Sequence, residues 1–158
     1  MTRFALTGLA GYIAPRHLKA IKEVGGVLVA GLDPATNVGI VDSFFPEAEF
    51  FTEPEAFEAY LEDLRDRGEG VDYLSIASPN HLHYPQIRMA LRLGANALSE
   101  KPLVLWPEEI ARLKELEART GRRVYTVLQL RVHPSLLALK ERLGQERGAK
   151  DVVLTYVT

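Results

Sequence analysis

The sequence predicts an α/β fold, a doubly wound parallel sheet with helices on both faces. Short apolar segments of strand length alternate along the chain with longer segments that have the periodicity of amphipathic helices. One of the short segments, residues 27–32, contains no polar position, which is typical of a parallel strand buried on both faces. Strands that alternate with crossover helices form a parallel sheet of this class.

The composition is that of a globular protein and excludes several classes of function. The chain has 158 residues, of which 47% are hydrophobic, enough to bury the core of one domain. Its 19 basic and 21 acidic residues give a net charge of −2, which offers no electrostatic reason to expect nucleic acid or an anionic membrane as a partner. Without cysteine, the chain has no disulfide, thiolate zinc site or cysteine nucleophile.

The apolar N-terminal segment, residues 4–14, is expected to form a strand and a turn rather than a signal peptide. Gly8, Gly11 and Tyr12 interrupt the segment, it runs directly into charged residues, and no small-residue cleavage site follows. No apolar run approaches the roughly 18–20 residues that a membrane helix needs. We therefore expect a cytoplasmic protein without a membrane partner.

Turn residues and apolar periodicity locate the individual elements. Strands are expected at residues 3–7, 27–32, 49–51, 71–76, 95–99 and 123–130. Helices are expected at residues 13–24 and 83–93, after Thr52 and after Pro107. Thr52 would be the N-cap of its helix, with Glu55 completing a capping box. The loop over residues 33–45 is expected to be irregular.

The last section of the chain does not fit the same sheet. Pro134 and Ser135 open a predicted helix, and residues 150–158 alternate like one more strand. We interpret residues 1–130 as one complete domain and residues 131–158 as the first helix and strand of a truncated second α+β domain. Because the backbone groups of a strand need a neighbour, we expect a homo-oligomer that forms through this strand.

The turn after the first strand reads Gly8-Leu9-Ala10-Gly11-Tyr12-Ile13-Ala14. A dinucleotide-binding fold needs a tight turn there, a close backbone approach to the pyrophosphate, and a small residue where the helix meets the strand. Gly8, Gly11 and Ala14 can fill these three roles, although their spacing is GxxGxxA rather than GxGxxG. The pyrophosphate would bind at the helix N-terminus. A glycine turn by itself is weak evidence for such a site.

Asp33 ends the second strand, where dinucleotide-binding folds place an acidic side chain that accepts hydrogen bonds from the adenine ribose. The alternative is an aspartate that forms a turn before Pro34. A carboxylate at this position also repels the 2′-phosphate of NADP, and no arginine occurs between Arg16 and Arg65 to offset the repulsion. The sequence therefore predicts NAD as the cofactor.

Two further motifs follow the fourth and fifth strands, at the carboxyl edge where such sheets bind ligands. They are Ser78-Pro79-Asn80-His81-Leu82-His83 and Glu100-Lys101-Pro102. His81 and His83 have no third ligand nearby in the sequence, so we expect no metal site. Lys101 is either solvated, as most lysines are, or a chemical group at the cofactor cleft, and its location favours the second.

These motifs together resemble those of the glucose–fructose oxidoreductase, inositol dehydrogenase and rhizopine-catabolism family. Glu100-Lys101-Pro102 and Ser78-Pro79-Asn80-x-x-His83 carry the resemblance, and Gln129-Leu130-Arg131-x-His133-Pro134 extends it. Residues 8–17 and 42–46 are most similar to one branch, the UDP-N-acetyl-2-amino-2-deoxyglucuronate dehydrogenases of lipopolysaccharide synthesis. The resemblance implies a Rossmann fold and NAD-dependent oxidation of the C3 hydroxyl of a UDP-sugar.

The resemblance also implies roles for individual residues. Lys101 would be the catalytic residue and contact the reacting hydroxyl, while Arg131 and His133 would face the substrate. The residues implied in cofactor binding are Gly8, Gly11, Tyr12, Ile13, Asp33, Ser78, Pro79, Asn80, His83, Glu100 and Gln129. Arg16 and His17 fit a solvated helix face equally well. The Lys101–Pro102 bond is expected to be cis.

Members of this family are considerably longer, and their second domain supplies a Gly-x-His-x-x-Asp element. The histidine of that element acts as acid and base beside the lysine. None of the four histidines in this sequence has that spacing. Two hypotheses follow. The chain is the NAD-binding part of a nucleotide-sugar dehydrogenase, or it is a catalytically silent module that binds NAD or a partner protein.

Overall fold

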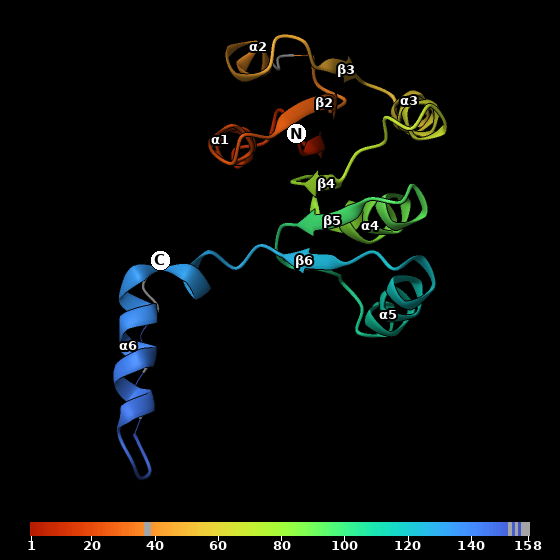
Figure 1. The fold of residues 1–158 in the computed structure, drawn as a ribbon. Coiled ribbons are helices and arrows are strands. Elements are labelled where there is room, and N and C mark those ends of the chain that lie inside the picture. Colours follow the sequence, from red (N-terminus) through yellow and green to blue (C-terminus); the bar gives the residue numbers. More distant parts are fainter. Residues whose placement is uncertain (37–38, 152, 154, 156–158) are drawn as a thin grey trace. The chain divides into compact units, whose positions relative to one another are not determined.

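The computed structural model describes residues 1–36, 39–151, 153 and 155. The chain divides into two compact units, Met1–Val127 and Leu128–Thr158, and each is described by itself. This division lies close to the boundary after residue 130 that the sequence suggests. The first unit holds the sheet and the helices that cover it (Figure 1).

Six parallel strands form one sheet in the first unit. They are β1 (Arg3–Thr7), β2 (Val27–Leu32), β3 (Glu49–Phe51), β4 (Tyr73–Ile76), β5 (Asn96–Ser99) and β6 (Val124–Thr126). Their order in the sheet is β3-β2-β1-β4-β5-β6, and every neighbouring pair is parallel. The chain therefore adds β2 and β3 on one side of β1, then returns and adds β4, β5 and β6 on the other side. A reversal of this kind is where doubly wound sheets bind dinucleotides.

Helices cover both faces of this sheet. They are α1 (Ala14–Glu23), α2 (Ile40–Phe44), α3 (Pro54–Asp66), α4 (His83–Arg92) and α5 (Glu108–Thr120). Helices α1 and α2 lie on one face, and α3, α4 and α5 lie on the other (Figure 1). The predicted doubly wound α/β fold is therefore confirmed. In the part of the chain that the structure describes, no helix combines the length and the apolar character needed to cross a membrane.

Each face of the sheet has its own apolar core, which explains why β2 is an uninterrupted run without polar residues. Phe4 of β1 belongs to a core with Leu18 of α1. The next residue along β1, Ala5, belongs to the opposite core with Phe57 of α3 and Ile87 of α4. Successive side chains of a strand point to opposite faces, so a central strand that is covered on both sides favours apolar residues at neighbouring positions.

Helix α1 lies within one residue of the predicted range at each end. Its buried stripe consists of Ala14, His17, Leu18 and Ile21, whereas Val24 is 70% exposed. Positions 14, 17, 18 and 21 share one face of a helix because they are three or four residues apart. His17 therefore points toward the sheet, and the interpretation of this residue as part of a solvated face is wrong.

Two elements between β2 and α3 differ from the prediction. Residues 40–44 form the short helix α2 instead of an irregular loop, because Val41 packs into the core on the α1 side. Helix α3 begins at Pro54 with Glu53 as its N-cap, and no side chain caps it. The capping box predicted at Thr52 is therefore wrong, since proline at the first position already starts the helix.

Strand β6 is shorter than predicted, because it has a partner over only part of the expected range. Its residues pair with Ala97–Ser99 of β5, and the pairing ends where β5 ends. The N–H of Val127 makes a last bond of 2.8 Å to the carbonyl of Ser99. The remainder of the predicted strand instead forms a 3-10 turn, η2 (Gln129–Val132), in the second unit.

The second unit consists of η2 and α6 (Pro134–Gln145). His133 is the N-cap of α6, and its ring accepts the N–H of Ser135 at 3.3 Å, so the predicted helix is confirmed. Of the strand predicted at residues 150–158, the described residues 150, 151, 153 and 155 have no regular structure. The other positions lie outside the described residues, and the contact between copies expected there stays a prediction.

Candidate functional site

The predicted site motifs of the first unit meet at the carboxyl edge of its sheet. The register pairs Thr7, the last residue of β1, with Leu32 of β2 and with Ile76 of β4. Ile76 in turn pairs with Ser99 of β5. The loops that leave these four strands therefore begin side by side. They carry the glycine turn, Asp33, the Ser78-Pro79-Asn80 motif and the Glu100-Lys101-Pro102 motif.

The glycine turn has a shape that requires glycine at position 8. Gly8 has a φ of +82°, and a Cβ at this position would collide with the carbonyl group of Ala77. The N–H of Gly11 donates to the carbonyl of Gly8 at 3.0 Å and closes the turn before α1. Within the described part of the chain, the N–H groups of Tyr12 and Ile13 have no acceptor. Unpaired N–H groups at the start of a helix are suited to a phosphate.

Asp33 is buried, with 8% of its surface exposed, and its carboxylate holds two loops. Oδ2 accepts the N–H of Ala10 in the glycine turn at 2.8 Å, and Oδ1 accepts the N–H of Ala35 at 2.9 Å. The bond to Ala35 is the turn contact that was the alternative to ribose binding. Because each carboxylate oxygen can accept a second hydrogen bond, both roles are compatible at this residue.

A cavity of about 590 Å³ opens next to Asp33. The ends of β1 and β2, the start of α3, and the segment that leads from β4 into α4 surround it. Gly8, Asp33, Ser78 and Pro79 are among its lining residues. Its volume lies within the roughly 300–1,000 Å³ of ligand sites, and apolar walls with a few polar groups suit a base and its ribose.

Other residues implied in cofactor binding belong to the same two loops of the carboxyl edge. Tyr12 is 86% exposed on the glycine turn, and Ile13 is the N-cap of α1. Asn80 begins the 3-10 turn η1 (Asn80–Leu82) that leads into α4. The structure thus brings the glycine turn and the Ser78-Pro79-Asn80 motif to the same edge of the sheet, as the sequence predicts.

Gln86 of α4 is a site residue that the sequence analysis missed. Its Oε1 accepts the hydroxyl protons of Thr7 at 2.8 Å and Ser78 at 2.7 Å, and the side chain lines the cavity. It therefore joins the ends of β1 and β4 at the reversal of the sheet. The sequence has no signal for this role, because only the strand order brings Thr7 and Ser78 together.

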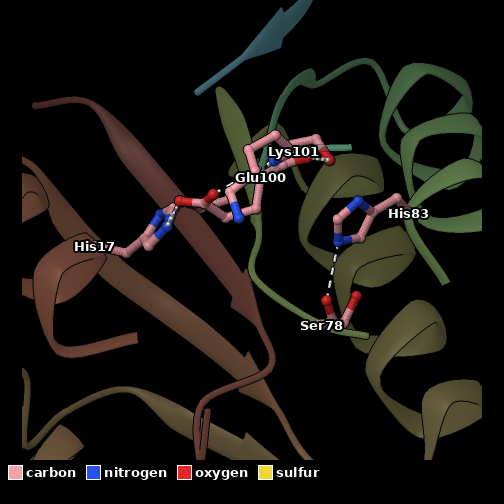
Figure 2. Close-up of polar contacts among 7 residues, drawn as sticks. His17, Ser78, His83, Glu100 and Lys101 are labelled. Carbon is pink, nitrogen blue, oxygen red and sulfur yellow. Dashed lines mark hydrogen bonds and ion pairs between the residues drawn. The ribbon is translucent and has the colours of Figure 1, made fainter. Parts of the chain in front are cut away.

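Glu100 follows β5 and is buried, with 7% of its surface exposed. Its Oε1 lies 3.2 Å from Nε2 of His17, and its Oε2 accepts the N–H of Lys101 at 3.3 Å (Figure 2). On the other side of the imidazole ring, Nδ1 lies 2.8 Å from the hydroxyl of Ser75 in β4. A buried polar chain thus runs from α1 to the Lys101 loop.

His83 is fully buried at the start of α4 and joins the loops that follow β4 and β5. Its Nδ1 lies 2.7 Å from the carbonyl of Pro102, and its Nε2 lies 2.9 Å from the carbonyl of Ser78 (Figure 2). Both ring nitrogens are therefore engaged with the backbone. His81 is exposed and lines the cavity. Among the residues that the structure describes, no cluster of three or more ligand side chains could hold a metal ion.

Lys101 lies exposed at the carboxyl edge, between Glu100 and Pro102. The Lys101–Pro102 bond is cis, as expected. Three residues implied by the resemblance, Gln129, Arg131 and His133, are in the second unit, where they belong to η2 and the N-cap of α6. Because that unit is described by itself, their part in the site stays a prediction.

The first unit can therefore bind a dinucleotide at three points of one edge. The N–H groups of the glycine turn can receive a pyrophosphate, the Asp33 carboxylate can accept ribose hydroxyls, and the cavity can hold an adenine base. Lys101 adds an ammonium group on the same edge. An ammonium stabilises negative charge on a nearby oxygen, so this edge combines cofactor binding with a group that can assist proton removal.

Known proteins match this chain in sequence and in structure. The WlbA (WbpB) dehydrogenase from Thermus thermophilus, solved in complex with NAD and UDP-GlcNAcA, is 98% identical over 94% of this chain and 48% of its own, with a TM-score of 0.91. An uncharacterised oxidoreductase of Rhizobium meliloti is 30% identical over 85% of this chain and 38% of its own. Inositol 2-dehydrogenase of Paracoccus denitrificans is 28% identical over 90% and 42%. The chain thus spans less than half the length of these proteins.

The family model of oxidoreductases with an NAD-binding Rossmann fold matches residues 2–128. This range covers the sheet, the glycine turn, Asp33 and the Glu100-Lys101-Pro102 motif. The match agrees with the strand order and with the shape of the carboxyl edge, both of which suit a dinucleotide. The chain therefore belongs to the oxidoreductase family with an NAD-binding Rossmann fold, the family that the sequence motifs resemble.

Proposed function

We propose that this chain is the NAD-binding part of a dehydrogenase that oxidises the C3 hydroxyl of UDP-GlcNAcA in lipopolysaccharide synthesis. The observation that carries the proposal is the 98% identity to the WlbA dehydrogenase solved with NAD and UDP-GlcNAcA. The compared region covers 94% of this chain. The identity favours an enzyme over a catalytically silent module.

The residues of the carboxyl edge fit NAD. Gly8 has no side chain, so the glycine turn packs directly against the backbone of Ala77 and Ser78. The N–H groups of Tyr12 and Ile13 on this turn can donate to a pyrophosphate. Asp33 would accept the ribose hydroxyls with the lone pairs that Ala10 and Ala35 leave free. A 2′-phosphate would meet this carboxylate, so the site favours NAD over NADP.

Lys101 would act on the sugar hydroxyl. When it is bound, the cofactor supplies the acceptor for the hydride that leaves the sugar carbon. The Lys101 ammonium would donate a hydrogen bond to the hydroxyl oxygen and stabilise the charge that develops there as the proton leaves. Glu100 would line the nicotinamide site, while Gln129, Arg131 and His133 would contribute from the second unit. The reaction is expected to take place in the cytoplasm.

The experiment is an assay of NADH formation with the chain completed by the remaining sequence of the Thermus thermophilus dehydrogenase. We expect NADH to form with UDP-GlcNAcA and NAD, and NADPH to form more slowly when NADP replaces NAD. UDP-GlcNAc, which lacks the carboxylate of UDP-GlcNAcA, is the matched control substrate. The proposal is wrong if the completed protein binds NAD but forms no NADH with UDP-GlcNAcA.

A further inference from the structure

Two buried histidines lie on either side of the Lys101 loop, and neither lines the cofactor cavity. His17 and His83 have exposed fractions of 8% and 0%. Burying a polar ring is costly unless its nitrogens are hydrogen-bonded, and all four nitrogens here have a partner. Three of the four contacts are to residues of the two loops that carry the site motifs, namely Glu100, Pro102 and Ser78 (Figure 2).

The partners of His17 determine where its proton lies. The Glu100 carboxylate can only accept, so Nε2 carries the proton and donates to Oε1 at 3.2 Å. Within the described residues the Ser75 hydroxyl has no other partner, so it donates to Nδ1 at 2.8 Å. His17 therefore fixes one oxygen of Glu100, and the other oxygen accepts the N–H of Lys101 at 3.3 Å.

The partners of His83 fix the loop from the opposite side. The carbonyls of Pro102 and Ser78 can only accept, and each lies within hydrogen-bond distance of one ring nitrogen, Nδ1 at 2.7 Å and Nε2 at 2.9 Å. The ring thus links the residue after Lys101 to the loop that lines the cofactor cavity. Glu100 and Pro102, the two neighbours of Lys101, are each held by one histidine.

We propose that His17 and His83 are positioning residues that fix the backbone on both sides of Lys101. The side chain of Lys101 is exposed and long, so the place of its ammonium group depends on how firmly its backbone is held. A displacement of about 1 Å at a reacting group can cost about a hundredfold in rate. The two histidines connect α1 and α4, the helices that border the cofactor site, to the residue that acts on the substrate.

This inference rests on the proposed function, and its test uses the completed dehydrogenase. His17→Met and His83→Met remove the ring donors and keep the bulk, whereas His17→Gln and His83→Gln retain an N–H donor. Ile21→Val is the matched control, because Ile21 is buried on the same face of α1 as His17 and belongs to the apolar core. The readouts are kcat, the Kd of NADH, and the amide hydrogen exchange of Lys101.

We expect each Met variant to lower kcat about tenfold or more and each Gln variant to recover most of that loss, with the Kd of NADH changed less than about threefold. His17→Met should also speed amide exchange at Lys101, whose N–H then faces a loosened carboxylate. The proposal is overturned if the Met and Gln variants have equal kcat, if Ile21→Val costs as much, or if the loss is in NADH affinity.

Failure of the proposed function gives a different result. The parent protein would then form no NADH with UDP-GlcNAcA, whatever the variants do. Amide exchange at Lys101 still tests the positioning role, because it needs no substrate. Faster exchange in His17→Met, with Ile21→Val unchanged, supports the role of His17. Equal exchange in the parent and in both variants overturns it.

Discussion

Replacing Asp33 by alanine should weaken both the glycine turn and cofactor binding. The substitution removes the acceptor of two backbone hydrogen bonds, from Ala10 at 2.8 Å and from Ala35 at 2.9 Å. A hydrogen bond to a charged group contributes about 1.5–3 kcal/mol. Because Ala10 and Ala35 are exposed and water can replace the lost acceptor, we expect roughly 1.5–3 kcal/mol for the pair rather than twice that.

The effect on the cofactor is separate and should add to the loss of stability. Loss of the ribose acceptor should weaken NAD binding by roughly 1–3 kcal/mol, which corresponds to an increase in Kd of about 5- to 150-fold. Calorimetric titration with NAD and with NADP, together with urea unfolding of the free chain, measures the two effects independently. Asp33→Asn, which keeps one carbonyl acceptor but no charge, should be intermediate in stability and should narrow the preference for NAD.

The assignment of Asp33 would be refuted by a parent chain that binds NAD and NADP equally. It would also be refuted by an Asp33→Ala variant that stays folded and binds NAD as tightly as the parent. A variant that loses stability but keeps its NAD affinity would show that Asp33 only forms the turn, which is the alternative that the sequence left open.

Three further substitutions test other parts of the account. Gly8→Ala forces a Cβ toward the Ala77 carbonyl at a φ of +82° and should abolish measurable NADH binding. The control, Gly25→Ala, has a φ of +70° and open space around the new Cβ, so it should change only stability. Equal NADH affinity in the two variants would contradict the close approach of Gly8 to Ala77. Lys101→Met in the completed enzyme should leave the Kd of NADH unchanged and lower kcat about 10²-fold or more, and normal turnover would remove the lysine from the mechanism. Phe57→Ala, at a fully buried core position, should lower the free energy of unfolding by about 3–5 kcal/mol, and a loss below about 1 kcal/mol would mean that α3 packs differently.

The fold could be predicted because its signals are local. The strand at 27–32 and the helix after Thr52 depend on residues close together in the sequence, and the alternation of such elements determines the fold class. The errors come where tertiary contacts decide. Helix α2 exists because Val41 reaches a core formed by distant residues, and β6 ends where its partner β5 ends. Neither cause is visible in the local sequence.

In the candidate site, too, residues with a local sequence signal could be predicted, whereas residues that depend on long-range contacts could not. Gly8 and Asp33 were identified because their types and spacing are tied to a known turn and strand end. His17 was assigned equally to a solvated face, because its partner Glu100 is 83 residues away in the sequence. Gln86 was missed for the same reason, since its contact with Thr7 spans 79 residues. Residues that support a site through long-range contacts carry no local signal.

The most direct test of the central claim is a titration of the 158-residue chain with NAD, followed by the backbone amide shifts in NMR spectra. Binding at the carboxyl edge should perturb the amides of Tyr12 and Ile13 on the glycine turn, of Ala35 beside Asp33, and of Ser78. The amides at the opposite ends of the strands, such as Arg3, should stay unchanged. Shifts that cluster away from the carboxyl edge, or no saturable shifts with NAD, would contradict the assignment of this edge as the cofactor site.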